Sequence, residues 1–318
     1  MNIEPVAAVD IGSNNIRLSI FDISDGSATE LISSRIAAGL NNSIVNNSLD
    51  GDGISRLLET LRHFKKIVQS FRNIRAVYPF ATASLRDLTN QPEILRLVRE
   101  QIGWEVEVLP VADEARYAFL GATRGEVDTG VLADIGGGST EIILFKDNKM
   151  TQWTGLQCGS LSLFRDFIDR LLPNKQEYRH LRAELRRRLK ELNIRVEPQP
   201  VLCVVGGTGR AVLQLYNEAA FGSGSLDILA RETPDPAERT IPAEMLGRLT
   251  SSLMNMGERA AARTILWVKP DRIHTLMPGM ILLESLAEHF RVPKLLISPT
   301  GVREGYLIEH LLRNENGD

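Results

Sequence analysis

Two short segments of the chain share one pattern, and this repeat constrains the fold more than any other feature. In each segment an apolar run ends in Asp-Ile-Gly, and the two triplets begin at Asp10 and Asp134. A polar or glycine-rich turn and a second apolar run follow both triplets. This order is typical of strand, tight turn and strand. It predicts an internal repeat of two related halves that present their turns to a shared cleft.

The second turn has the composition of an anion site beside a metal ligand. Three glycines at 136–138 allow positive φ angles and leave backbone N–H groups open to an anion, and Ser139 and Thr140 add donors. Asp134 places a hard oxygen ligand, the type that Mg²⁺ prefers, at the end of the preceding strand. The turn therefore predicts a phosphate held with a metal. A β-hairpin with a glycine-rich turn and an incidental aspartate is the alternative.

Two charged residues in the first half are candidates for catalysis. Arg86 follows a predicted strand at 75–81, and catalytic residues of open α/β sheets gather past strand ends. A surface ion pair with Asp87 is an equally good interpretation of Arg86. Glu114 lies at the start of a predicted helix for which Asp113 is the candidate cap. From the residues alone, a role of these carboxylates in complementing the helix dipole is favoured over proton transfer by Glu114.

Two segments of the second half offer further anion sites. An apolar strand at 201–205 runs into Gly206-Gly207-Thr208 and a helix, a turn that favours anions or serves only close packing. The amphipathic helix predicted at 178–192 carries a basic face. Such a face is usually solvated, and a track for a polyanion is the alternative. The Gly/Ser-rich and Pro-rich segment 221–237 is predicted to be a surface loop.

Composition excludes several classes of protein. The net charge of −3 over 318 residues gives no general attraction to nucleic acid. Two cysteines, Cys158 and Cys203, are too few for a disulfide framework, which favours a reducing compartment. No apolar run approaches the length of a membrane span, and no secretory leader pattern is visible. We therefore expect a cytoplasmic protein without nucleic-acid or membrane partners.

Taken together, these segments resemble the exopolyphosphatase / guanosine pentaphosphate phosphohydrolase family. The matching pieces occur in the order of the family motifs and span almost the whole chain. They are Asp10–Asn14 with Arg17-Leu18, Ala81–Asp87, Asp113–Arg116 with Gly121, Asp134–Glu141, Gly206–Thr208 and Gly301–Gly305.

The resemblance implies a fold, a domain organisation and a reaction. The fold is actin-like (ribonuclease H-like) α/β, with two domains, each built on a mixed five-stranded sheet, around an interdomain cleft. Domain I covers residues 1–123 and is joined by a C-terminal helix at about 300–318, and domain II covers 124–299. The reaction is Mg²⁺-dependent hydrolysis of a terminal phosphoanhydride, and a monovalent cation is a further candidate cofactor. The substrate is inorganic polyphosphate or guanosine pentaphosphate, which would connect the protein to the stringent response, and the expected assembly is a homodimer.

The resemblance also assigns roles to residues. Glu114 corresponds to the catalytic base that orients water, and Arg86 to an arginine that contacts phosphate. Asp134 is the metal-site carboxylate, with Glu141 as the second metal candidate. The phosphate-binding candidates are Asp10, Ser13, Asn14 and Arg17 on the first loop, Gly136, Gly137, Gly138 and Ser139 on the second, and Gly207 and Thr208 on the third.

Two alternatives stay open. The first is a non-catalytic sensor that binds a guanosine alarmone or polyphosphate. The second is an ATP-using enzyme of the same fold.

Overall fold

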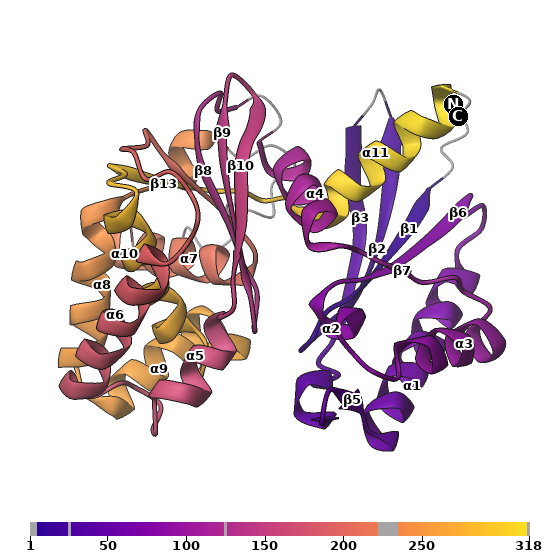
Figure 1. Cartoon of the computed structure of the whole chain (residues 1–318), viewed down its shortest axis with the longest axis horizontal. Helices are drawn as coiled ribbons and strands as arrows, with labels where there is room; N and C mark the ends of the chain where they lie inside the picture. The colour runs from indigo at the N-terminus through magenta and orange to yellow at the C-terminus, as the bar shows by residue number, and fades with distance from the viewer. Residues whose placement is uncertain (1–4, 25–26, 124–125, 222–234, 317–318) are drawn as a thin grey trace. The chain divides into compact units, whose positions relative to one another are not determined.

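The computed structural model describes residues 5–24, 27–123, 126–221 and 235–316 (Figure 1). Helices and strands are interspersed along the chain, and two mixed sheets contain all of the described strands except the β4–β5 hairpin. The chain divides into two compact units. The first unit contains Met1–Tyr117 and Arg303–Asp318, and the second contains Ala118–Val302. The two ends of the chain therefore belong to the same unit.

The first unit is built on a five-stranded sheet of order β3-β2-β1-β6-β7. β1, β2 and β3 are antiparallel neighbours, whereas β6 and β7 continue the sheet in parallel with β1. The strands are β1 (Val6–Ile11), β2 (Ile16–Ser24), β3 (Ser27–Ile36), β6 (Ala76–Ala81) and β7 (Glu107–Val108).

Helices cover both faces of this sheet. Ala7, Val9 and Leu18 share an apolar core with α1 and α3. On the other face, Phe80 of β6 packs against Tyr306 of α11 with 4.6 Å between ring centroids. Because side chains alternate along a strand, Asp10 and Arg17 lie on the α11 face. The remaining elements are η1 (Leu40–Ser43), β4 (Ile44–Val45), β5 (Ser48–Leu49), α1 (Gly51–Ser70), α2 (Ala83–Arg86), α3 (Gln91–Ile102), α4 (Val111–Thr123) and α11 (Val302–Asn316).

The second unit repeats this topology and adds one strand. Its sheet has the order β10-β9-β8-β11-β13-β12, and the first five strands match the directions of the five in the first unit. The α/β fold class is therefore confirmed, with a sixth strand where five were expected. β12 is three residues long and lies antiparallel to β13 at the edge. The strands are β8 (Gly130–Ile135), β9 (Thr140–Lys146), β10 (Lys149–Leu156), β11 (Leu202–Val205), β12 (Thr240–Pro242) and β13 (Lys294–Ile297).

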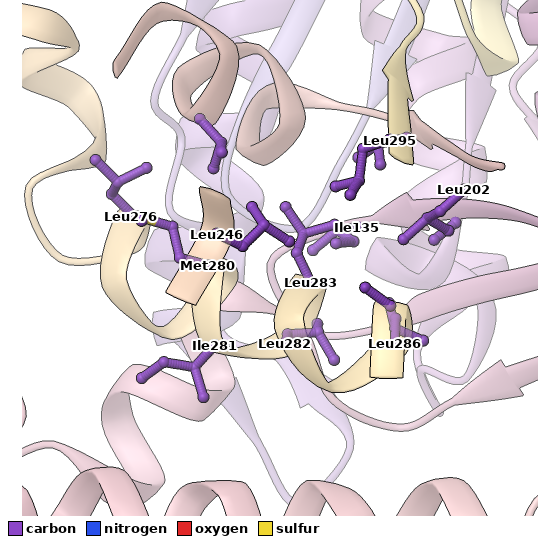
Figure 2. Packing of buried hydrophobic residues seen from close by; sticks show 14 of the residues in the cluster. Ile135, Leu202, Leu246, Leu276, Met280, Ile281, Leu282, Leu283, Leu286 and Leu295 are labelled. Atoms are coloured by element: carbon purple, nitrogen blue, oxygen red, sulfur yellow. The ribbon is translucent and has the colours of Figure 1, made fainter. Parts of the chain in front are cut away.

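A predominantly apolar helix that is buried on all sides forms the centre of the second unit. Every residue of α10 from Leu276 to Ala287 is buried, as expected for a helix surrounded by other elements. Figure 2 shows its side chains gathered with Leu246 of α8 and with Ile135, Leu202 and Leu295 of the sheet. The helices of this unit are α5 (Ser160–Phe167), α6 (Lys175–Lys190), α7 (Gly207–Phe221), η3 (Pro236–Arg239), α8 (Ala243–Asn255), α9 (Glu258–Val268), η4 (Pro270–Arg272) and α10 (Leu276–His289).

Some local expectations need correction. Helix α4 begins at Val111, so Asp113 lies inside its first turn and is not its cap. Helix α2 occupies part of the predicted loop after β6, and helix α6 begins at Lys175 behind an Asn174 cap. Most of the loop predicted at 221–237 lies outside the described residues, and its end forms η3. Among the described helices, none has the length and apolar content needed to cross a membrane.

Candidate active site

The first turn, between β1 and β2, is held by backbone bonds. The Gly12 N–H donates to the Asn15 carbonyl at 3.1 Å, and a Cβ at Gly12 would lie 2.9 Å from that oxygen. The carbonyl oxygens of Ser13 and Asn14 accept bonds from the amides of Asn41 and Gly39. The segment around η1 therefore fixes the backbone of the turn. The side chains of Ser13 and Asn14 are partly exposed, as phosphate donors must be.

Asp10 and Arg17 face each other across β1 and β2. Burial raises the pKa of the Asp10 carboxyl, and the positive charges of Arg303 and Arg17 oppose that rise. Asp10 as a whole residue is intermediate in exposure. The first turn thus begins with an acidic group whose ionisation depends on its basic neighbours.

Arg86 and Glu114 form an ion pair. Arg86 ends helix α2 just past β6, and its Nε donates to the Leu109 carbonyl at 2.8 Å. This bond aims the guanidinium at α4, where Nη2 donates to Glu114 Oε2. The partner of Arg86 is therefore Glu114 and not the adjacent Asp87, the surface pair considered from the sequence.

The environment of the Glu114 carboxyl raises its pKa. The residue is 7% exposed and lies in the first turn of α4, where its N–H donates to the Pro110 carbonyl at 3.0 Å. Burial raises the pKa of Glu114, the Arg86 charge lowers it, and the Asp10 charge adds a further rise. A carboxylate with a raised pKa accepts a proton more readily than an exposed one. Arg86, Glu114 and Asp10 thus form one electrostatic group within the first unit.

The second turn, between β8 and β9, is fixed by the start of α5. The carbonyl of Gly136 accepts a bond from Ser160 at 3.0 Å, and that of Gly137 accepts one from Leu161 at 2.9 Å. A Cβ at Gly159 would lie 2.5 Å from the Gly136 oxygen, so only glycine permits this approach. The bonds from α5 therefore fix the backbone of this turn, and anion binding by its N–H groups stays a prediction.

Asp134 and Glu141 are opposite each other at the base of the second turn. Directly opposed side chains share one face of the sheet, so two carboxylates project together. The described residues contain no cluster of three or more histidine, cysteine or acidic side chains suited to a metal. Mg²⁺ often uses only one or two carboxylates and completes its shell with water and substrate phosphates. The donor set of Asp134 and Glu141 therefore fits Mg²⁺.

The third glycine turn lies against Asp134. Gly206 has a φ of +95°, and a Cβ there would lie 3.2 Å from Asp134 Oδ1. A Cβ at Gly207 would collide with the guanidinium of Arg272. The turn at the start of α7 thus brings Asp134 and Arg272 toward the same glycines. The sequence analysis did not predict that Arg272 lies at this turn. In the sequence it is a single basic residue that follows Pro270 between two helices.

Thr208 has a different environment from its glycine neighbours. Its side chain is completely buried and packs against Gly279 of α10. Because the whole residue is 0% exposed, the backbone N–H of Thr208 is buried as well. Gly207 is partly exposed, and phosphate binding by Gly207 and Thr208 stays a prediction.

The basic helix α6 makes many of its contacts with acidic side chains of its own unit. Arg182 Nη1 donates to buried Glu284 Oε2 at 2.8 Å, and Arg186 lies 3.2 Å from Glu288. Arg187 pairs with Glu184 and Glu191. Arg182 and Arg186 therefore connect α6 with α10, whereas the Arg187 pairs lie within α6 and at the residue that follows it. These contacts fit a structural role for the helix, and the polyanion track stays an untested alternative.

The predicted site residues fall into two sets, one in each unit. The first unit brings together Asp10, Ser13, Asn14, Arg17, Arg86 and Glu114. The second unit brings together Asp134, Gly136, Gly137, Gly138, Ser139, Glu141, Gly207 and Thr208. That both sets face one cleft stays a prediction.

Comparison with known proteins gives consistent results. Residues 19–314 match the model of the Ppx/GppA phosphatase family. Exopolyphosphatase 1 of Mycobacterium tuberculosis is 27% identical over 325 residues, which cover 98% of this chain and 90% of the relative. The crystal structure of the Aquifex aeolicus Ppx/GppA family member matches with a TM-score of 0.80 at 24% identity, over 99% of this chain and 100% of that one. An exopolyphosphatase structure from Cytophaga hutchinsonii matches with a TM-score of 0.77 at 20% identity, over 96% and 97% of the two chains.

Proposed function

Because the chain belongs to the Ppx/GppA phosphatase family, we propose that it releases terminal orthophosphate from inorganic polyphosphate. The polymer is the first choice because the relatives that match almost the whole chain are named as exopolyphosphatases. Guanosine pentaphosphate presents the same kind of terminal anhydride and is the second substrate to test.

The observation that carries the proposal is the buried pair of Arg86 and Glu114 beside Asp10. Glu114 accepts a proton from a water molecule as the water oxygen bonds to the terminal phosphorus. The bond from that phosphorus to the bridging oxygen breaks, and the shortened polyphosphate leaves. Arg86 holds the Glu114 carboxylate in place and contributes positive charge where phosphate oxygens gather negative charge.

The turns supply the binding groups in this proposal. Ser13, Asn14 and Arg17 provide side-chain donors from the first turn. The backbone of the 136–139 turn provides N–H donors, and Ser139 adds a hydroxyl. Phosphoryl transfer depends on positioning and on neutralisation of charge more than on covalent chemistry by the protein. Hydrogen-bond donors of this kind are therefore sufficient to bind the substrate phosphates.

Mg²⁺ would be held by Asp134 and Glu141, with water and phosphate oxygens as its other ligands. When bound, the ion would offset the negative charge of the substrate phosphates. The two carboxylates alone would repel a polyanion, so we expect polyphosphate binding to weaken when the metal is removed.

The test is an assay of phosphate release by the purified protein with Mg²⁺. Polyphosphates of several lengths, guanosine pentaphosphate and ATP are supplied in parallel. Release from polyphosphate with little from ATP is expected. Tight binding of polyphosphate or guanosine pentaphosphate without release would contradict the proposal and favour a sensor. Release from ATP alone would favour an ATP-using enzyme.

A homodimer is a separate part of the proposal and rests on the family resemblance. Sedimentation velocity with and without substrate measures the assembly directly. A single monomeric species at micromolar concentration would contradict it and would leave the proposed reaction unaffected.

A further inference from the structure

Arg303 is a buried cation at the start of the C-terminal helix, within the Gly301–Gly305 segment. It is 8% exposed and lies in the first turn of α11. Its Nη1 donates to Glu30 Oε1 of β3 at 2.9 Å and also to the Ser19 hydroxyl of β2. Its Nη2 lies 3.7 Å from Glu304 Oε1. The guanidinium is therefore fixed between the helix and two strands.

The strand register places this guanidinium next to the first turn. Asp10 is opposite Arg17, and Ala8 is opposite Ser19, so Ser19 is one step along the strands on the same face as Asp10. Diagonal neighbours of this kind lie about 7–8 Å apart. A cation bound to Ser19 is thus within the range of a direct charge effect on Asp10.

Charged groups from three neighbouring elements interact with the Asp10 carboxyl, namely Arg17 of β2, Arg303 and Glu304 of α11, and Glu114 of α4. Glu30 of β3 interacts with the same two arginines. Burial raises the pKa of Asp10, and the Arg303 charge is the largest influence that lowers it, ahead of Arg17. Removal of Arg303 would leave Arg17 as the cation that still lowers the pKa of Asp10.

We propose that Arg303 is a positioning residue for the first phosphate turn, where it keeps Asp10 charged and aligned with Arg17. It acts through Asp10 and not by touching substrate, because the guanidinium is itself buried and is held by buried Ser19, by buried Glu304 and by Glu30 of β3. This inference rests on the proposed function, in which the Asp10 turn binds substrate phosphate.

The first test measures Asp10 without any need for turnover. The titration of ¹³C-labelled aspartate carboxyls is followed by NMR, and Asp10→Asn identifies the Asp10 signal. Arg303→Met should move the Asp10 midpoint upward by about one pH unit, because a nearby opposite charge shifts a carboxyl by 1–3 units. Arg303→Lys should shift it less. An unchanged midpoint in folded Arg303→Met protein would overturn the inference.

The second test is a double-mutant cycle on polyphosphate hydrolysis. Arg303→Met should lower kcat/KM by roughly ten- to a hundredfold, the range for a displaced binding group. In an Asp10→Asn background it should have little further effect. A purely structural role would lower kcat/KM by the same factor in both backgrounds, and that result would overturn the inference.

Two additional variants make the tests independent of folding and of the proposed function. Ser19→Ala keeps the cation but removes one of its bonds, and it replaces Arg303→Met as the test if that variant fails to fold. A severalfold loss of kcat/KM is expected for Ser19→Ala. An unchanged kcat/KM in Ser19→Ala would then count against the inference. Tyr306→Phe is the matched control, since it removes the 2.6 Å bond from α11 to Glu107 and should leave the Asp10 midpoint unchanged. If the wild-type protein releases no phosphate, the proposed function fails, whereas the NMR titration still tests Arg303.

Discussion

The two Asp-Ile-Gly turns have the same strand topology but different surroundings. The first turn is surrounded by charged side chains, with Arg17 and Arg303 near Asp10 and the Arg86–Glu114 pair close by. The second turn is built largely from backbone, and its carbonyls are bonded to the start of α5. The comparison teaches that one scaffold can be specialised in two ways. In our proposal, the first half supplies proton transfer and charge, and the second half supplies amide donors and metal ligands.

The largest effect is expected from Glu114→Gln, which removes the proposed base from the first half. General-base catalysis contributes about 10²–10⁴-fold, so kcat should fall by roughly a thousandfold. Polyphosphate affinity, measured by calorimetry, should stay within a fewfold of wild type. Asp113→Asn is the matched control because it alters the adjacent acid, which pairs with Arg116 at 3.1 Å. Near-normal turnover in Glu114→Gln would remove this residue from the mechanism.

The next effect is expected from Arg86→Met, which leaves a buried carboxylate without its cation. Activity should fall by about a hundredfold, and stability to urea should fall by about 3 kcal/mol. The pH profile should also change. Arg86 lowers the pKa of Glu114, so its loss raises that pKa, and the ionised base then appears only at higher pH. If the acidic limb of the pH–activity profile did not move to higher pH in Arg86→Met, Arg86 would not control the ionisation of Glu114.

A smaller effect is expected from Asp134→Asn in the second half. The change removes one of two carboxylates and should raise the Mg²⁺ concentration for half-maximal activity by about tenfold, a typical cost of altering a metal site. Saturating Mg²⁺ should restore much of kcat. Asp128→Asn, on an exposed residue bonded to Asn148, is the control. An unchanged Mg²⁺ requirement in Asp134→Asn would place the metal elsewhere.

The smallest effect is expected from a substitution at Gly159, which lies against the backbone of the second turn. Gly159→Ala places a Cβ 2.5 Å from the Gly136 carbonyl and should lower the free energy of unfolding by about 1–3 kcal/mol. Gly247→Ala in α8 meets no atom within 4 Å and should stabilise by about 0.5–1 kcal/mol. Thermal unfolding measures both. If Gly159→Ala were as stable as wild type, the turn would be more adaptable than its contacts indicate.

The sequence was informative where the chemistry is local. The repeated triplet and its glycines predicted both turns, because strand, turn and strand are short-range patterns. The link between Arg86 and Glu114 depends on how α2 and α4 pack, and no local pattern encodes it. The burial of Arg303 beside Ser19 likewise joins residues from opposite ends of the chain.

The missed elements have similar physical explanations. Helix α9 begins directly after Gly257 and was not predicted. Its buried face contains only Ala261, Ile265 and Val268, which is too short a set for helical periodicity to be recognised. The edge strand β12 contains only Thr240–Pro242, which is too short for an alternating pattern to be recognised. Arg272 reaches Gly207 only through the packing of η4 near the start of α7, so its place at the site could not be predicted from spacing.

The return of α11 to the first unit has a consequence for synthesis. The ribosome completes β1 to α4 and then the whole second unit before α11 emerges. Until then, Glu30 and Asp10 lack the cation that faces them in the finished unit. The second unit can assemble from consecutive residues, whereas the first must wait for a long-range contact, which is intrinsically slow to form. The Asp10 turn therefore acquires its Arg303 neighbour late, and in our proposal a truncated chain without α11 would lack a complete reaction centre.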